Sequence, residues 1–167
     1  MKSMTLIGMP GSGKSTIGKL LARKLGWVFI DLDDLIKEKT GKTYSQILEQ
    51  DGGKKLIEIE NQFTLDLKFD KPAVFSPGGS IIYSMQAMEK LKKETTVVYI
   101  ELLINEVKKR LDGRADKGGI IGLKEKGIDR LYEERAIIYK TMADFTVKTD
   151  GLNEDQIADE ILKVVQK

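Results

Sequence analysis

Residues 4–16, MTLIGMPGSGKST, decide the fold of this chain. The first four form a short apolar run typical of a buried strand, and the apolar residues after the stretch recur at helical spacing. Between them, Gly8, Gly13, Lys14 and Ser15 occupy the fixed positions of the phosphate-binding pattern G-x-x-x-x-G-K-[ST]. An ordinary glycine-rich turn between a strand and a helix would not need all four residues in this register. The stretch therefore predicts a nucleoside triphosphate site.

The chemistry of a polyphosphate explains why these residue types stand together. Glycines allow backbone N–H groups and the positive N-terminus of the following helix to wrap around an anion. Lys14 can reach the β- and γ-phosphates, and the Ser15 hydroxyl can bind Mg²⁺. The predicted nucleotide contacts in this loop are Gly8, Gly11, Ser12, Gly13, Lys14, Ser15 and Thr16.

The composition narrows the possible functions. Of 167 residues, 41% are hydrophobic and 32% charged, as in a globular protein. The net charge of +2 gives no reason to expect a nucleic-acid partner. No apolar run approaches the roughly 18 residues of a membrane span, so we expect a cytoplasmic protein with no membrane partner. Cysteine and histidine are absent, so proton transfer must use a carboxylate, a lysine, a tyrosine or water.

Five short β-rich segments alternate with helical patterns along the chain. This alternation is typical of an α/β fold in which a five-stranded parallel sheet is flanked by helices and binds ligands at the carboxyl ends of its strands. No repeat, low-complexity tract or linker divides residues 1–167, and we expect a single domain with a mobile insert. The predicted strands are Met4–Ile7, Val28–Asp31, Ala73–Ser76, Thr96–Glu101 and Phe145–Lys148.

Three aspartates follow the second predicted strand, at positions 31, 33 and 34. Because neighbouring parallel strands end at the same edge, these carboxylates should lie near the phosphate loop. Leu32 separates Asp31 from Asp33, an alternation that lets both face a cleft; the simpler alternative is that Asp33 or Asp34 only caps a helix. The third strand does not end in an aspartate, so Asp31 is the best candidate for a metal ligand beside Ser15.

Two charged residues fall on apolar faces of predicted helices. A helical pattern over 44–69 is broken near residues 51–53. Glu60 lies in the apolar stripe of its second part, where a carboxylate is costly unless it is paired or used. The alternative is that it sits at the edge of the stripe. Arg135 lies on or beside the inward face of a helix over 129–142, so we expect an anionic partner for it.

Glycine-rich segments follow two further predicted elements. Gly78 and Gly79 come after the third strand, where they form either a plain turn or a backbone that a ligand can approach closely. Residues 113–127 carry five glycines and are typical of a lid that excludes water and supplies cations through Arg114 or Lys117. A surface loop is the alternative. Arg110, at the end of the preceding helix, suits the helix dipole and can also lie against a nucleotide base.

The segments GMPGSGKST, DLDD, IEIE, SPGGS and LYEERAIIY resemble, in order and spacing, those of the shikimate kinases, over essentially the whole chain. The resemblance implies a three-layer phosphate-loop kinase that uses ATP and Mg²⁺ to phosphorylate the 3-hydroxyl of shikimate in aromatic amino-acid biosynthesis. Acceptor-binding helices would span about 33–69. The roles implied are catalysis by Lys14, Asp33 and Arg114, Mg²⁺ organised by Ser15 and Asp31, adenine near Arg110, and acceptor contacts from Asp33, Glu60, Gly78, Gly79 and Arg135, the last on the acceptor carboxylate.

Three features depart from the family pattern. Ile57 stands where members usually have an arginine that clamps the acceptor carboxylate, Ser80 replaces a third glycine, and the lid lacks an Arg-Pro pair. A second prediction is therefore the same kinase chemistry on another small hydroxyl compound, such as a sugar acid or a hydroxy amino acid. A third is a nucleotide-dependent switch with little transfer activity. A nucleotide kinase is disfavoured, because no basic, base-reading insert accompanies the DLDD segment of this chain. We expect a monomer whose partner is a small hydroxy acid.

Overall fold

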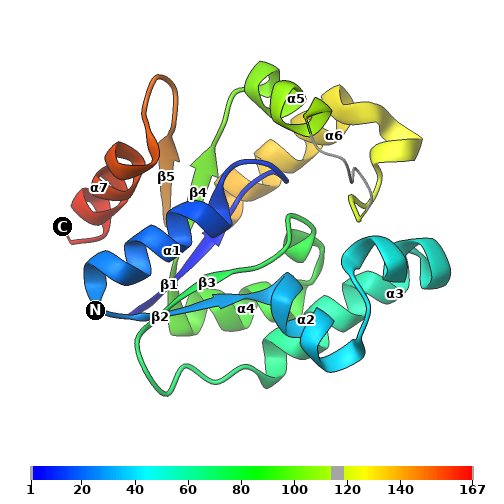
Figure 1. Ribbon diagram of the computed structural model, residues 1–167, viewed down its shortest axis with the longest axis horizontal. Coiled ribbons are helices and arrows are strands. Elements are labelled where there is room, and N and C mark those ends of the chain that lie inside the picture. The colour runs from blue at the N-terminus through cyan, green and yellow to red at the C-terminus, as the bar shows by residue number, and fades with distance from the viewer. Residues whose placement is uncertain (1, 114–118, 167) are drawn as a thin grey trace.

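The computed structural model describes residues 2–113 and 119–166 of the chain. Its strands form one parallel five-stranded sheet in the order β2-β3-β1-β4-β5, flanked by helices, as the sequence predicts (Figure 1). In chain order the elements are β1 (Ser3–Ile7), α1 (Lys14–Leu25), β2 (Val28–Asp31), α2 (Leu32–Thr40), α3 (Tyr44–Asp66), β3 (Ala73–Ser76), the short 3₁₀ helix η1 (Ile81–Tyr83), α4 (Met85–Glu94), β4 (Thr95–Glu101), α5 (Ile104–Asp112), α6 (Leu123–Met142), β5 (Phe145–Lys148) and α7 (Glu154–Val165).

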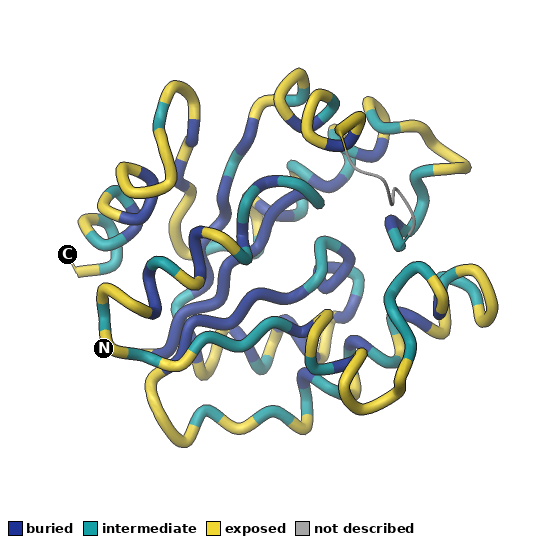
Figure 2. The backbone as a smooth tube through the Cα atoms, viewed as in Figure 1, coloured by how far each residue is buried: buried dark blue, intermediate teal, exposed yellow. Residues whose placement is uncertain are grey.

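Helices on both faces of the sheet create two apolar cores. One core lies under α1 and α7, and the other lies under α4 and α6. Strand β4 contributes to both because its side chains alternate: Val97 and Tyr99 enter one core, while Val98 and Ile100 enter the other. Figure 2 shows the central strands as the most deeply buried backbone, whereas α2 and much of α3 are exposed.

The predicted strands agree with the structure to within one residue at their ends, and the helices differ more. Helix α5 begins at Ile104, three residues after β4 ends at Glu101. Helix α6 begins at Leu123 and breaks at Gly127, whose φ is 73°, so the predicted lid overlaps its first turn. Of the described helices, none is long and apolar enough to span a membrane.

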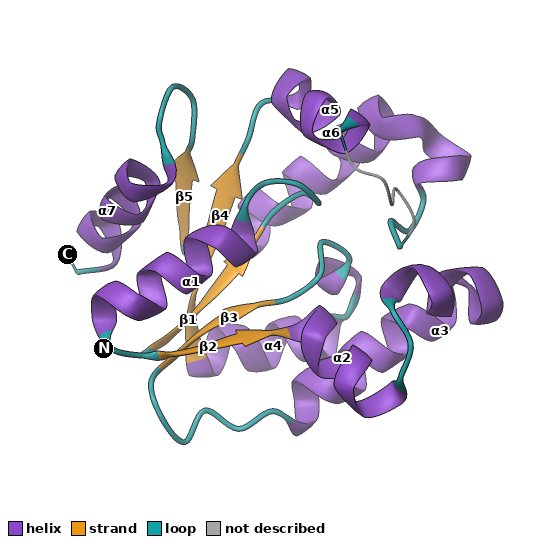
Figure 3. Ribbon diagram, viewed as in Figure 1, coloured by secondary structure: helices purple, strands orange, loops and turns teal. Residues whose placement is uncertain are grey.

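The chain passes from β2 into α2 without a loop, and this explains how the aspartates are placed. Asp31 is the last residue of β2 and also caps α2, because its side chain accepts hydrogen bonds from the backbone N–H groups of Asp33 and Asp34. The alternative that Asp33 or Asp34 is the cap is therefore wrong. Their side chains are left for other partners at the carboxyl edge of the sheet, where Figure 3 shows the loops after β1 and β3.

Helix α3 is built from two segments. Thr43 begins it with a capping box, in which the Thr43 side chain and Gln46 each bond the other's backbone N–H. Gly52 then interrupts the helix with a φ of 83°, at the break that the sequence predicts. The second segment carries Glu60 beneath the turn that follows β3, in contact with Ser80.

Candidate active site

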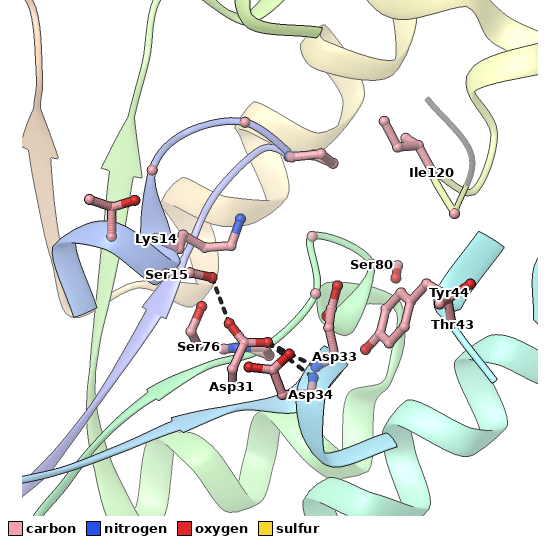
Figure 4. Close-up of a pocket in the computed structure, with 18 of the residues that line it drawn as sticks. Lys14, Ser15, Asp31, Asp33, Asp34, Thr43, Tyr44, Ser76, Ser80 and Ile120 are labelled. Atoms are coloured by element: carbon pink, nitrogen blue, oxygen red, sulfur yellow. Dashed lines mark hydrogen bonds between the residues drawn. The ribbon is translucent and has the colours of Figure 1, made fainter. Parts of the chain in front are cut away.

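A cavity of about 800 Å³ opens at the carboxyl edge of the sheet (Figure 4). Its walls come from the phosphate loop, the first turns of α2 and α3, the turn after β3, and single residues of α5 and α6. The site residues predicted from the sequence that line it are Gly11, Gly13, Lys14, Ser15, Thr16, Asp31, Asp33, Gly78, Gly79, Arg110 and Arg135. Gly8, Ser12 and Glu60 are buried and do not line it. Arg114 and Lys117 lie outside the described residues.

The phosphate loop presents the start of α1 to the cavity. Gly13 is the N-cap of this helix with a φ of 89°, a conformation that favours glycine, and among the described residues no side-chain cap bond closes this end of the helix. The Lys14 ammonium group donates to the carbonyls of Gly8 and Met9, both at 3.0 Å, and therefore lies across the loop. The Arg110 guanidinium donates to the Gly11 carbonyl at 3.1 Å from the side of α5. The loop combines a helix dipole and two cations, as an anion requires.

Asp31 joins the phosphate loop to the second strand. Its Oδ2 atom accepts a hydrogen bond of 2.6 Å from the Ser15 hydroxyl, and its Oδ1 atom accepts one of 3.0 Å from the Asp33 N–H (Figure 4). A hydroxyl and a carboxylate at one spot are hard oxygen donors of the kind that Mg²⁺ prefers. Within residues 2–113 and 119–166, no three acidic side chains converge into a metal cage. Magnesium bound here would therefore complete its shell with phosphate oxygens and water.

Asp33 stands at the side of the cavity that faces the loop. Its carboxyl group opens to solvent within the cavity, yet the surrounding walls remove much of its water. This desolvation, followed by the negative charge of Asp31, raises the pKa of Asp33 to about 6, against the opposing effects of the Lys14 charge and the Tyr44 hydroxyl. A carboxylate with a pKa close to neutral pH suits a general base.

The wall opposite the loop is built on a buried carboxyl group. Glu60 is fully buried and accepts hydrogen bonds from Ser80 Oγ at 2.6 Å and from the Tyr44 hydroxyl at 3.0 Å. Burial raises the pKa of Glu60 to about 7, while these two hydrogen bonds lower it. A Cβ atom on Gly78 would lie 2.6 Å from Glu60 Oε1 and 2.7 Å from a Tyr44 ring carbon, so a larger residue here would displace one of these side chains. The hydrogen bonds from two hydroxyl groups thus explain how Glu60 can be buried on the apolar face of α3.

Arg135 reaches the cavity from α6 with only 1% of its surface exposed. Its Nε atom donates to the Tyr83 hydroxyl at 3.3 Å, and its Nη2 atom donates to the Ile121 carbonyl at 2.8 Å. In the described part of the chain no carboxylate forms an ion pair with it, so the anionic partner expected from the sequence is absent there. The third guanidinium nitrogen, Nη1, lies beside Gly79 at the cavity wall. A ligand carboxylate would supply the missing anion.

The segment after the undescribed residues packs against the start of α3. A Cβ atom on Gly119 would lie 3.0 Å from Tyr44 Cβ, and Ile120 is 7% exposed and lines the cavity. This contact brings Gly119 and Ile120, from the middle of the predicted lid, against the Tyr44 side of the cavity.

Tyr44 is a cavity residue that the sequence alone does not reveal. An aromatic residue in the first turn of an amphipathic helix is usually a core residue, and its distance of 16 positions from Glu60 matches no helical repeat. The bond between the two arises because the break at Gly52 turns the helix. Other lining residues outside the predicted set include Lys19, Asp34, Lys37, Thr43, Ser45, Ser76, Ser80 and Ile120.

Together, the phosphate loop, the parallel sheet and a carboxylate beside the loop define a phosphate-loop kinase of a small molecule. Comparison with known proteins narrows this class. The family model described as "Shikimate kinase" matches residues 10–166, and the chain belongs to this family. It is 35% identical to the shikimate kinase of Sulfurihydrogenibium sp. (strain YO3AOP1), with 100% of this chain and 99% of that protein aligned.

Solved structures agree with the sequence comparisons. The shikimate kinase of Acinetobacter baumannii in complex with shikimate superposes with a TM-score of 0.88 at 28% identity, covering 99% of this chain and 93% of that one. The shikimate kinase of Aquifex aeolicus superposes with a TM-score of 0.81 at 30% identity, covering 98% and 96% of the two chains. The resemblance inferred from the sequence motifs is confirmed at the level of family and fold.

Proposed function

We propose that this chain transfers the γ-phosphate of ATP to the 3-hydroxyl group of shikimate. The observation that carries the proposal is the placement of the phosphate loop, Asp33 and Arg135 around one cavity in a chain of this family. The loop supplies the donor site, and Arg135 supplies a guanidinium group that forms no ion pair with a carboxylate among the described residues. Asp33 lines the same cavity and interacts with the Lys14 charge, so it can act on an acceptor hydroxyl that approaches the phosphate.

In the proposed reaction, the 3-hydroxyl oxygen forms the new bond to phosphorus while the bond between the γ-phosphorus and the oxygen of ADP breaks. Asp33 takes the proton of the hydroxyl. Lys14 leaves the loop carbonyls to contact the phosphates, and loop N–H groups bind the charge that develops on them. Positioning and charge stabilisation, rather than covalent catalysis, account for the rate enhancement.

The proposal assigns Mg²⁺ to the pair formed by Ser15 and Asp31. The metal would neutralise phosphate charge, and the Ser15 hydroxyl could bind it through an oxygen lone pair while donating its proton to Asp31. We further assign residues 113–127 to a lid and Arg110 to the adenine side of the site, and we expect a single-domain cytoplasmic monomer. Light scattering on the purified chain tests the last expectation.

The decisive experiment compares Asp33→Asn with the unaltered protein in a coupled assay of ADP release with shikimate. We expect kcat to fall by about 10²–10⁴-fold, while calorimetric binding of ATP changes little. Asp70→Asn, an exposed carboxylate outside the cavity, is the matched control. A nucleotide-dependent switch would be indifferent to Asp33→Asn, and this outcome would refute the kinase assignment.

The second candidate keeps the chemistry and changes the acceptor, and Ile57 is the observation that favours it. Among the described residues at the cavity, Arg135 has no second arginine beside it on the acceptor side, so one carboxylate cannot be held by two guanidinium groups there. If shikimate were not a substrate while a screen of hydroxy acids gave ADP release, the acceptor assignment would be replaced. If Ile57→Arg raised kcat/KM for shikimate, the first candidate would be supported.

A further inference from the structure

Glu60 lies behind the part of the cavity wall that Tyr44 and Ser80 form, here called the acceptor wall. It does not line the cavity, but both of its hydrogen-bond donors, Tyr44 and Ser80, do (Figure 4). The two residues come from different parts of the chain, the first turn of α3 and the turn after β3. One buried carboxyl group therefore fixes the positions of two hydroxyl groups on the wall.

The direction of these hydrogen bonds decides what the wall offers to a ligand. A hydroxyl group has one proton and two lone pairs. When Glu60 is ionised, both hydroxyls must donate their protons to it, because a carboxylate can only accept. The free lone pairs of Tyr44 and Ser80 are then the hydrogen-bonding groups left for the cavity. Such a wall accepts hydrogen bonds and disfavours a ligand carboxylate or carbonyl.

We propose that Tyr44 and Ser80, held by Glu60, are specificity-determining residues that accept hydrogen bonds from the hydroxyl groups of a polyhydroxylated acceptor. This inference rests on the proposed function and deepens it. Arg135 lies on the other side of the turn after β3, with Nη1 beside Gly79, and suits the acid group. The site then separates the two ends of a hydroxy acid: the guanidinium binds the carboxylate, and the hydroxyl wall binds the hydroxyls near Asp33.

The position of Tyr44 supports this assignment. Its hydroxyl donates to Glu60 and lies near Asp33, so it is next to the group that would take the acceptor proton. Gly119 packs against its Cβ atom, which restricts the ring from the opposite side. A hydroxyl held between a buried carboxyl and the base is well placed to align an acceptor.

The test measures kinetics and binding with shikimate and with its 4-deoxy and 5-deoxy analogues. It is run at about pH 8.5, because burial raises the pKa of Glu60 to about 7 and the carboxyl must be ionised. The groups that face Glu60 are Tyr44, Ser80, Asp33 and Arg135. The variants are Tyr44→Phe and Ser80→Ala. Tyr132→Phe is the control, since its hydroxyl donates to the Leu102 carbonyl at 2.8 Å and does not line the cavity.

We expect each cavity variant to lower kcat/KM for shikimate by about 3- to 10-fold, the cost of one neutral hydrogen bond, with KM for ATP unchanged. The loss should disappear with the deoxy analogue that lacks the hydroxyl concerned. A purely structural role would predict the same loss with all three ligands, and this result, or the absence of any loss, would overturn the inference.

Binding separates this inference from the proposed function. Calorimetry with the unaltered protein should give tighter binding of shikimate than of at least one deoxy analogue, and the difference should vanish in Tyr44→Phe or Ser80→Ala. Binding of this kind without turnover would refute the proposed function alone. Failure to bind any of the three ligands, or equal binding of all three, would refute the inference.

Discussion

Replacing Glu60 by glutamine should make the stability of the protein depend on pH in a new way. Glu60 is fully buried, and burial raises its pKa from 4.5 to about 7 in the folded state. Between these two values the folded protein holds more protons than the unfolded chain. The stabilising contribution of Glu60 is therefore complete below pH 4.5 and is lost as the pH rises through 7. Glutamine has a similar shape and does not ionise.

The pKa shift of Glu60, from 4.5 to about 7, sets the size of this change in stability. At 1.36 kcal/mol per pKa unit it corresponds to about 3 kcal/mol in the free energy of unfolding. For a domain of this length, about 3 kcal/mol corresponds to roughly 6–12 °C in the melting temperature. We therefore expect the melting temperature of Glu60→Gln, relative to the unaltered protein, to rise by this amount between about pH 4.5 and 8.

Circular dichroism melts across this pH range provide the measurement. Glu49→Gln, an exposed glutamate on the same helix, is the matched control and should show no comparable trend. A constant difference between Glu60→Gln and the unaltered protein at all pH values would show that Glu60 ionises as freely in the folded state as in the unfolded chain. The reasoning about the buried carboxyl group would then be refuted.

Three further predictions concern the metal, the acid and the turn after β3. Asp31→Asn keeps an N-cap for α2, so the protein should stay folded, but the Mg²⁺ concentration for half-maximal activity should rise about 10-fold or more; an unchanged Mg²⁺ requirement would contradict the metal assignment. Arg135→Lys loses the planar fork, so KM for the hydroxy acid should rise about 10-fold with KM for ATP unchanged; equal changes in both would count against a carboxylate contact. Gly78→Ala places a Cβ atom 2.6 Å from Glu60 Oε1, and thermal melts should show a loss of about 1–3 kcal/mol, whereas unchanged stability would mean that the wall can shift.

The sheet and the donor side of the site are predictable from the sequence because both depend on local patterns. Each strand is a short β-rich run, and the phosphate loop has a fixed spacing of glycines, Lys14 and Ser15. Asp31 and Asp33 are predictable as neighbours of the loop, since parallel strands end at one edge. Which of the two caps α2 and which faces the cavity cannot be predicted in the same way. This depends on β2 entering α2 without a loop, which makes Asp31 the cap.

The acceptor side depends on contacts between distant segments, which no local pattern encodes. Tyr44 meets Glu60 only because Gly52 breaks α3, and Ser80 reaches the same carboxyl from the turn after β3. The helical pattern around Arg135 correctly predicts its burial but not its neutral partners, Tyr83 and the Ile121 carbonyl. The apolar stripe identifies Glu60 as unusual without indicating how its charge is accommodated.

Arg135, on α6, contacts both the cavity and the segment of residues 119–121. Its Nη2 atom binds the Ile121 carbonyl while Nη1 lies at the cavity wall beside Gly79. An anion bound at Nη1 and the seating of residues 119–121 thus act on one rigid, planar group. If seating tightens the grip on the anion by some factor, bound anion must favour seating by the same factor. Anion binding at Arg135 and the packing of residues 119–121 are then thermodynamically linked, and a change that weakens this packing should lower the affinity for the acid.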